Sequence, residues 1–510
     1  MKHKILTLAI MTSSLLTMSS CLDMTPVSSI TDENMWTNEG QFTSFVNGVH
    51  SMLRDKDSQN LFILGELRSD IYSASSSGWT TESNKAEEIT ANLLSEQRPG
   101  LTNYANLYTN INQINLFIKK TNETSLLSPE DKAYYLGTMY GLRAFYYFHL
   151  LRSWGSVVWQ EEPSMGFEID NLSKPVTSEA EIMQNIKKDI TSSENSFADD
   201  YSFRSNRSIW SKPATLILKA EVYLWSSRQM NGGEADAQTA LNALNELQSK
   251  TSEIGLETNF ADVFDYENKA NKEIIFTLHN DYKESLLFNG GWRNNMVPQQ
   301  NTLNSFYASA TGERFNLNFN GNVYYPLNVD IYHNVFNDDL DTRKEATLKA
   351  AYEKQENQYV YKGCFAYKFK GMTVEGDSYR TFADDYPIYR YADVLLLKAE
   401  AKALTGGDPS SEINDIRQRA YGNNYNAQTM AYGNMPGDSE GINEVLLRER
   451  LKEFMFEGKR WYDLRLAGDE YVLEHTTAEA TRLLWPIDKN TLTNNSALKQ
   501  TPGYESSGGK

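Results

Sequence analysis

Hydrophobic positions recur with the spacing of buried helix faces in two long stretches of the chain, which flank a stretch without that periodicity. Helix-start signals fix the boundaries. Ser128-Pro129-Glu130-Asp131 supplies an N-cap, a proline at the first helical position and acids in the first turn. Ser178 and Glu181 have the spacing of a capping box, and Asp408-Pro409 repeats the cap-then-proline order. These patterns predict helices over 101–122, 129–153, 178–196, 211–229, 235–249, 387–405, 409–420 and 441–467.

The helix expected over 129–153 is apolar or aromatic around almost its whole circumference, so it must pack between other helices. A faint internal repeat accompanies it, because the sequence Leu-Ile-Leu-Lys-Ala-Glu at 216–221 aligns with Leu-Leu-Leu-Lys-Ala-Glu at 395–400. A small alanine inside an apolar helix lets a neighbouring helix approach closely. Paired helices of this kind indicate a stack related to tetratricopeptide repeats.

Between about 251 and 385 the composition changes: Gly, Asn, Tyr and Phe predominate, and strand-like runs occur at 273–278 and 359–361. An earlier polar stretch at 73–81 interrupts the N-terminal helices. Long loops in compact proteins are usually functional. We therefore expect a mainly α fold in which a helical scaffold, chiefly 35–250 and 386–467, supports a loop-rich insertion at about 251–385.

The first residues have the pattern of a processing signal. A basic start, Met1 to Lys4, precedes an apolar run to about Met18 that is too short to span a membrane. Small residues then lead directly to Cys21. We expect residues 1–20 to be a lipoprotein signal peptide and Cys21 to be the lipidated residue; the alternative is an ordinary signal peptide with a chance cysteine. Removal of residues 1–20 deletes two lysines and no acid, so the formal charge of −18 becomes −20.

Composition excludes several classes of protein. The acidic balance, with a pI near 5.0, argues against a nucleic-acid partner. Two cysteines in 510 residues exclude a disulfide framework. With 40% hydrophobic and 12% aromatic residues, the chain can instead build a large core. Acyl chains on Cys21 would then tether an otherwise soluble protein to the membrane.

Catalytic and metal motifs are not found in the sequence. No two of the six histidines lie within four residues of each other, so the close zinc-binding spacing is missing, and no cofactor motif is present. We interpret His149 and Cys364 as buried structural residues, and the acidic segment 337–341 as a solvated turn rather than a cation site. Glu449, Glu453 and Glu457 form one helical row; a salt-bridged structural helix is the preferred interpretation, with an acid–base site as the alternative.

The same glutamate row carries a family resemblance. Glu449-Arg450, Glu453-Phe454, Glu457-Gly458, Arg460 and Asp463-Leu464 resemble the C-terminal signature of the SusD/RagB family of outer-membrane nutrient-binding lipoproteins. Further matches are Leu142 to Tyr147 with Trp154-Gly155, Ala392 to Ala401, Leu484 to Ile487, and Gln500 to Tyr504, where Thr501 replaces the usual Asn.

This resemblance implies tetratricopeptide-like helix pairs that support irregular loops, and a place on the bacterial outer membrane. It also implies a lid over a SusC-type TonB-dependent transporter that captures oligosaccharides, or peptides in some members, without catalysis. Similar proteins share their scaffold motifs but differ in their ligand residues, so no binding residue can be transferred by motif. The remaining alternatives are a peptide-binding protein, a surface glycoside hydrolase and a helical adaptor.

Ligand-binding residues must therefore be argued from chemistry. Sugar rings stack their C–H face on aromatic side chains while polar side chains hydrogen-bond the hydroxyls. Trp154, Trp225, Trp461 and Trp485 lie in apolar or signature segments and are expected in the core. Trp79 and Trp292 lie among polar residues and are the expected stacking anchors. Further candidates are Tyr72, Asn84, Tyr282, Arg293, Asn294 and Asn295, followed by Tyr324 and Tyr325.

Overall fold

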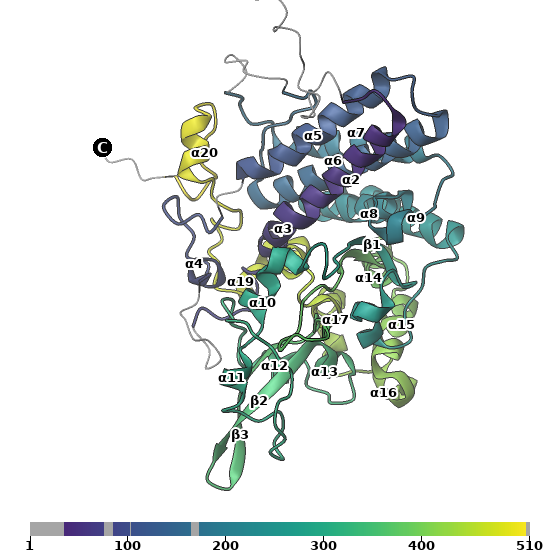
Figure 1. The fold of residues 1–510 in the computed structure, drawn as a ribbon. Coiled ribbons are helices and arrows are strands. Elements are labelled where there is room, and N and C mark those ends of the chain that lie inside the picture. The colour runs from purple at the N-terminus through teal and green to yellow at the C-terminus, as the bar shows by residue number, and fades with distance from the viewer. Residues whose placement is uncertain (1–34, 76–84, 102–103, 165–172, 506–510) are drawn as a thin grey trace, which may run out of the picture.

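The computed structural model describes residues 35–75, 85–101, 104–164 and 173–505 (Figure 1). The lipidation candidate Cys21 and the signal segment 1–20 lie outside the described residues. In the described part, no helix combines the length and the apolarity that a membrane crossing requires.

The N-terminal half is helical. Its elements are α2 (Glu39–Met52), the π-helical turn η1 (Leu53–Asp57), α3 (Ser58–Glu66), α4 (Glu87–Thr90), α5 (Tyr104–Glu123), α6 (Pro129–Trp154), α7 (Glu179–Phe197), η3 (Ser205–Arg207), α8 (Lys212–Gln229) and α9 (Gly233–Lys250). The predicted helices from α5 to α9 are confirmed within a few residues. Ser128 and Ser178 accept hydrogen bonds from the backbone N–H groups of Asp131 and Glu181, as their capping roles require.

Helix α6 is buried around its circumference because it packs against α5, α7 and α8. Close approach needs glycine at its surface: a Cβ on Gly141 would lie 2.1 Å from Trp210 Nε1. Helix α8 packs against α9, and α14 packs against both α9 and α15. The two copies of the sequence repeat, in α8 and α14, therefore occupy corresponding positions in successive helix pairs, which confirms the tetratricopeptide-like interpretation.

The middle of the chain contains short elements joined by loops. They are η4 (Phe260–Phe264), η5 (Tyr266–Asn268), β1 (Ile274–Leu278), η6 (Leu287–Gly290), α10 (Gly291–Met296), α11 (Gln300–Leu303), α12 (Ile331–Asn334), α13 (Arg343–Thr347), β2 (Leu348–Gln355) and β3 (Gln358–Ala366). Strands β2 and β3 form an antiparallel hairpin that projects from the body of the molecule (Figure 1). Both strand-like runs noted in the sequence are strands.

The C-terminal part returns to helices. It contains β4 (Tyr386–Arg390), α14 (Tyr391–Leu404), α15 (Ser410–Tyr421), η7 (Gly422–Asn424), α16 (Ala427–Met430), η8 (Asp438–Glu440), α17 (Ile442–Phe454), α18 (Arg460–Ala467), α19 (Asp469–His475) and α20 (Lys489–Asn494). The helix expected from 387 is wrong in its first turn, where residues 387–390 are extended. Strand β4 pairs antiparallel with β1, which supplies its hydrogen bonds from far back in the chain.

The helix expected over 441–467 is also wrong in its middle, because α17 ends at Phe454 and α18 begins at Arg460. The backbone leaves the helix at Met455, where ψ is 129°, and Phe456 and Gly458 then have positive φ angles of 71° and 72°. The free backbone N–H groups of the break donate to the buried carboxylate of Glu66 on α3, with Gly458 N at 2.7 Å and Lys459 N at 3.1 Å. Burial raises the pKa of Glu66 to about 8 despite these donors.

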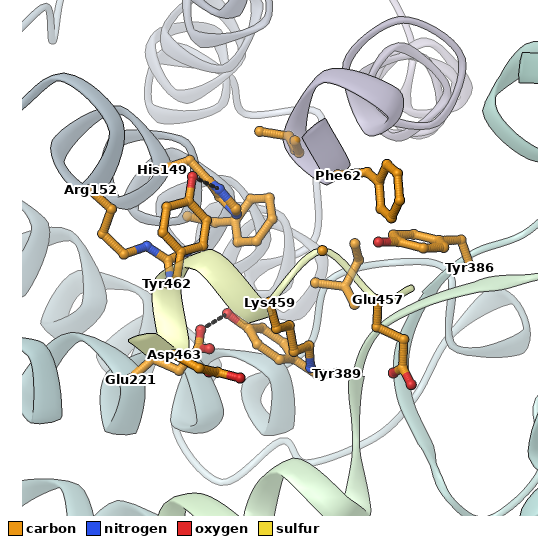
Figure 2. A pocket seen from close by; sticks show the side chains of 14 residues that line it. Phe62, His149, Arg152, Glu221, Tyr386, Tyr389, Glu457, Lys459, Tyr462 and Asp463 are labelled. Atoms are coloured by element: carbon orange, nitrogen blue, oxygen red, sulfur yellow. Dashed lines mark hydrogen bonds between the residues drawn. The ribbon is translucent and has the colours of Figure 1, made fainter. Parts of the chain in front are cut away.

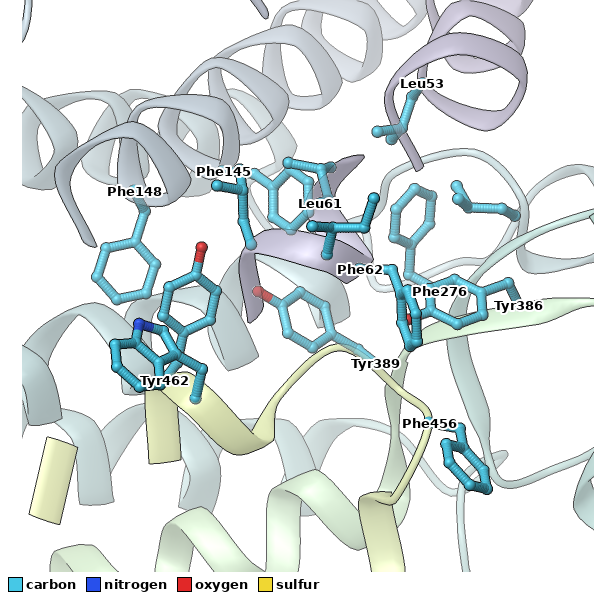
Figure 3. Close-up of a cluster of buried hydrophobic side chains, with 14 of the residues drawn as sticks. Leu53, Leu61, Phe62, Phe145, Phe148, Phe276, Tyr386, Tyr389, Phe456 and Tyr462 are labelled. Carbon is cyan, nitrogen blue, oxygen red and sulfur yellow. The ribbon is translucent and has the colours of Figure 1, made fainter. Parts of the chain in front are cut away.

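One continuous hydrophobic core joins the helical scaffold to the loop-rich region. Figure 3 shows Phe62 of α3, Phe145 and Phe148 of α6, Phe276 of β1, and Tyr386 and Tyr389 of β4 converging there. Trp154, Trp225, Trp461 and Trp485 are all buried, as the sequence predicts. The loops are therefore anchored to the scaffold by packed aromatic side chains.

A buried histidine fixes α2 against the segment before α8. His50 donates from Nδ1 to the carbonyl oxygen of Val46 at 2.8 Å, and its Nε2 accepts from the backbone N–H of Trp210 at 3.0 Å. Only the neutral ring can do both. Burial lowers the pKa of His50 to about 4, although the bond to Val46 opposes the shift.

Candidate functional site

Trp292, an expected stacking anchor, is a core residue. Its indole is fully buried, and Nε1 donates to the carbonyl oxygen of Phe369 at 3.1 Å. The rings of Phe62, Phe288, Phe369 and Phe456 surround it. The prediction of an exposed Trp292 is wrong because these apolar neighbours come mostly from distant segments, which a local reading of its polar flanks cannot detect.

Trp79 and Asn84 lie outside the described residues. The described residues on either side of them form backbone contacts with the segment 324–327. Tyr72 forms a bridge with Leu327, and the N–H of Lys85 donates to the carbonyl oxygen of Tyr324 at 3.2 Å. Segment 324–327 therefore contacts the chain on both sides of residues 76–84.

Three further candidates have buried side chains. The side chains of Tyr72, Asn295 and Tyr325 are each less than a tenth exposed, so the expectation that they face a ligand is wrong. Their backbones bind one segment to the next: the N–H of Tyr325 donates to the carbonyl oxygen of Asn295 at 2.9 Å. Tyr324, half-buried, likewise donates its N–H to Asn294. These contacts fix α10 beside segment 324–327.

Arg293 and Asn294 do reach a surface groove of about 600 Å³. Arg293 is exposed and Asn294 is half-buried. Residues from the π-helical turn and α3, from η6 and α10, and from a loop before β4 line this groove, hereafter the α10 groove. Its lining is Asp55, Lys56, Ser58, Gln59, Asn60, Leu286, Phe288, Asn289, Gly290, Gly291, Arg293, Asn294, Arg380, Thr381 and Phe382.

Positive charge predominates in the α10 groove. Among the described residues, Lys56, Arg293 and Arg380 have no ion-pair partner, although Arg380 donates to the carbonyl oxygens of Lys370 and Gly371. The single acid, Asp55, is already held by Arg54 at 2.7 Å and by the hydroxyl of Ser285 at 2.7 Å. Burial would raise the pKa of Asp55, but these two donors lower it overall. The groove of this acidic protein therefore has three cationic side chains that no described carboxylate neutralises.

Two exposed tyrosines lie in segments that adjoin residues of this groove. Tyr282 is 38% exposed and Tyr379 is 46% exposed, and within the described ranges they are the aromatic members of the set of exposed large hydrophobic side chains. Tyr379 directly precedes the groove residue Arg380. The turn that holds Tyr282 reaches the groove wall through the bond from Ser285 to Asp55. Tyr282 is a candidate predicted from sequence, whereas Tyr379 is not, although its polar flanks, Asp377-Ser378 and Arg380, are similar to those of Trp79.

A small interior pocket contains many titratable side chains (Figure 2). His149, Arg152 and Glu221 line it, and Glu221 accepts a hydrogen bond from the hydroxyl of Tyr389 at 2.8 Å. Its volume is about 50 Å³, far below the several hundred Å³ of a typical ligand pocket. Burial, and then the charge of Arg152, hold the pKa of His149 well below its usual value, so this ring is neutral at physiological pH. The prediction that His149 is a core residue is confirmed.

The three glutamates of the predicted row are structural, although only Glu449 and Glu453 lie on α17 and Glu457 lies in the break that follows it. Glu449, Glu453 and Glu457 are buried and each is compensated by cations. Arg343 and Arg417 bind Glu449 at 3.1 and 2.7 Å, and Arg390 and Lys368 bind Glu457 at 2.9 and 2.8 Å. Burial would raise the pKa of Glu457, but the charges of Arg390 and Lys368 lower it. The salt-bridged interpretation is confirmed.

Two other predictions from sequence are settled by burial. Cys364 is a buried free thiol, and burial raises its pKa to about 12, so it stays protonated. Asp338 and Asp339 are exposed or half-exposed as a solvated turn requires, but Asp341 is buried and binds Arg343 at 2.8 Å. The solvated-turn prediction is therefore wrong for Asp341, because a basic side chain two residues later folds back onto it.

Comparisons with known proteins agree along the chain. The SusD family profile matches residues 223–465, and a profile described as "Starch-binding associating with outer membrane" matches residues 22–224. The solved structure of B. fragilis NanU is 46% identical, with a TM-score of 0.88, over 95% of this chain and 100% of its own. SusD-like protein P38 of Formosa agariphila is 27% identical over 95% of both chains. Starch-binding protein SusD of Bacteroides thetaiotaomicron is 24% identical over 86% of this chain and 82% of its own.

Proposed function

Because this chain belongs to the SusD/RagB family, we propose that it is a non-catalytic outer-membrane lipoprotein that binds oligosaccharides and delivers them to a SusC-type TonB-dependent transporter. The matched family description and the name of the B. thetaiotaomicron relative support carbohydrate binding at the outer membrane. Cys21 provides the lipid anchor in this proposal. The α10 groove is the proposed ligand site, and no covalent step occurs in it.

The observation that carries this proposal is the chemistry of the α10 groove. Its volume of about 600 Å³ lies in the range of small-molecule sites. The amides of Gln59, Asn60, Asn289 and Asn294 offer both donors and acceptors for sugar hydroxyls. Tyr282 and Tyr379, in segments that adjoin the groove, offer exposed rings for the C–H face of a sugar.

The charge of the groove narrows the class of glycan. Lys56, Arg293 and Arg380 attract carboxylate or sulfate groups, and Arg293 and Arg380 can bind a carboxylate through two parallel hydrogen bonds. The single acid, Asp55, is already occupied by Arg54 and Ser285. Glycans with acidic sugars should therefore bind more tightly than neutral glycans of equal length, and added salt should reduce this preference.

A calorimetric titration of the lipid-free mature protein against neutral and acidic oligosaccharides tests the proposal. Tyr379→Ala and Arg293→Ala should each weaken binding about tenfold, which corresponds to the loss of one apolar or charge-assisted contact. Arg98→Ala, an exposed arginine outside the groove lining, is the matched control and should bind as the wild type does.

Other outcomes point to the alternatives. Binding of peptides but of no glycan would favour a peptide carrier. Release of new reducing ends during incubation would identify a hydrolase and overturn the non-catalytic assignment. For the anchor, Cys21→Ala should abolish incorporation of labelled palmitate and release the protein from membranes; retained label would place the lipid elsewhere.

A further inference from the structure

A second groove, of about 500 Å³, lies between the loop at 256–258, the start of α14, and α15. It shares no lining residue with the α10 groove. Figure 1 shows α14 and α15 at the right of the molecule and α10 nearer its left side. We call it the α15 groove; its lining is Leu256, Glu257, Thr258, Tyr391, Leu395, Asp415, Gln418, Arg419 and Gly422.

One wall of the α15 groove is apolar and rigid. Leu256 and the ring of Tyr391 are half-buried, and Leu395 lies beneath them in the core. The hydroxyl of Tyr391 accepts from Gln248 Nε2 at 2.9 Å, and its backbone N–H donates to the carbonyl oxygen of Glu273 at 2.8 Å. With both ends of the residue held, the ring presents a fixed surface and loses little entropy when a ligand packs on it.

The opposite rim is polar. Asp415 and Gln418 are exposed and stand three residues apart on α15, so they point to the same side of the helix. Thr258, in the same loop as Leu256, adds an exposed hydroxyl. Together they provide donors and acceptors opposite an aromatic surface, which is the arrangement that an amphipathic sugar ring requires.

The charge of the α15 groove is opposite to that of the α10 groove. Its one cation, Arg419, is only 8% exposed, and its guanidinium binds Glu273 at 3.1 Å and also Glu453. Among the described residues, Asp415 and Glu257 have no ion-pair partner. An anionic ligand would be repelled here, while an uncharged polyol meets no electrostatic penalty.

We propose that the α15 groove is a second carbohydrate site, selective for uncharged sugars. The C–H face of a sugar ring packs on Tyr391 and Leu256, while its hydroxyls hydrogen-bond with Gln418 and Asp415. This site rests on the proposed function, because it extends glycan capture to a second face of the same protein. Two sites of opposite charge preference allow the protein to hold a long or mixed glycan at two points.

The test isolates each groove with exposed substitutions. The background variant Arg293→Ala/Tyr379→Ala disables the α10 groove, and Asp415→Ala/Gln418→Ala is then added to it. Neutral maltotetraose and laminaritetraose serve as probes in calorimetry. Residual binding of a neutral probe is expected in the background variant, and the added substitutions should weaken it at least about tenfold. Gln238→Ala, an exposed glutamine on α9, is the control that should leave it unchanged.

The outcomes separate this proposal from the proposed function. If the background variant binds no neutral probe, or if Asp415→Ala/Gln418→Ala leaves its binding unchanged, the second site is refuted while the α10 groove stands. If the wild type binds no glycan at all, both fail. Density for a neutral tetrasaccharide against Tyr391 in a soaked crystal would support the site directly, and density only in the α10 groove would overturn it.

Discussion

Replacement of Glu453 by glutamine should destabilise the whole protein, because its carboxylate joins the loop-rich region to the scaffold. Glu453 is fully buried on α17 and binds Arg390 at 2.6 Å, Arg343 at 3.3 Å, and also Arg419. Burial alone would raise the pKa of Glu453, but the charges of Arg419, Arg390 and Arg343 hold it below its usual range. It is therefore ionised in the folded state.

The size of the expected destabilisation depends on which carboxylates remain bound to the arginines. Removal of one partner from a buried ionic group costs roughly 3–5 kcal/mol. Arg390 keeps Glu273 and Glu457, and Arg343 keeps Asp341 and Glu449. Because no guanidinium is left without a carboxylate, we expect the lower part of that range, about 3 kcal/mol.

Urea denaturation at pH 7, followed by circular dichroism, measures the free energy of unfolding. Glu440→Gln is the matched control: Glu440 is exposed and forms a surface ion pair with Arg448 at 2.9 Å, so its loss should cost less than about 1 kcal/mol. The double variant Glu453→Gln/Arg419→Gln should cost less than the sum of its single variants, because it restores the local charge balance. A Glu453→Gln variant as stable as Glu440→Gln would refute the reasoning.

Three further predictions concern packing and pH. The pKa of His50 is about 4 in the folded state against 6.5 in the unfolded state, so the stability it contributes is complete above pH 6.5 and is lost as pH falls through 4. The difference in unfolding free energy between wild type and His50→Gln should therefore shrink by up to about 3 kcal/mol between pH 7 and 4. A difference that stays constant with pH would contradict the assignment of a neutral ring. In Gly65→Ala the new Cβ would lie 1.8 Å from the carbonyl oxygen of Gly458, so urea denaturation should show an unfolding free energy lower by roughly 1–3 kcal/mol. Gly48→Ala is the control: Gly48 lies in α2 with open space around it, so the substitution should be neutral or slightly stabilising. Trp292→Ala should lower the unfolding free energy by about 3–5 kcal/mol because its indole is buried. Tyr379→Ala should change the unfolding free energy by less than about 0.5 kcal/mol and should affect glycan binding alone. A stable Trp292→Ala variant that binds glycan more weakly would instead identify Trp292 as a surface anchor.

Local signals predicted most helices of the scaffold correctly. Ser128, Ser178 and the apolar period of α6 act within a few residues, so their effect does not depend on the rest of the fold. The salt bridges of Glu449, Glu453 and Glu457 are confirmed as well, because neighbouring acids need compensating cations wherever they lie, but the single helical row is wrong for Glu457, which follows the end of α17.

The predictions from sequence are wrong where a segment distant in the chain supplies the hydrogen-bond or packing partner. Pairing with β1 keeps residues 387–390 extended, and the carboxylate of Glu66 receives the N–H groups of the break between α17 and α18. In the same way Trp292, polar in its own segment, is enclosed by rings from α3 and from residues 369 and 456.

The sequence by itself determined the helical class and the family, since each depends on spacing or composition within short windows. Only the tertiary structure decided which aromatic residues remain exposed. The α10 groove is built from residues 55–60, 286–294 and 380–382, which are adjacent only after the shared core has formed. Exposure is a property of that packing, because water is excluded by neighbours in space and not by neighbours in sequence.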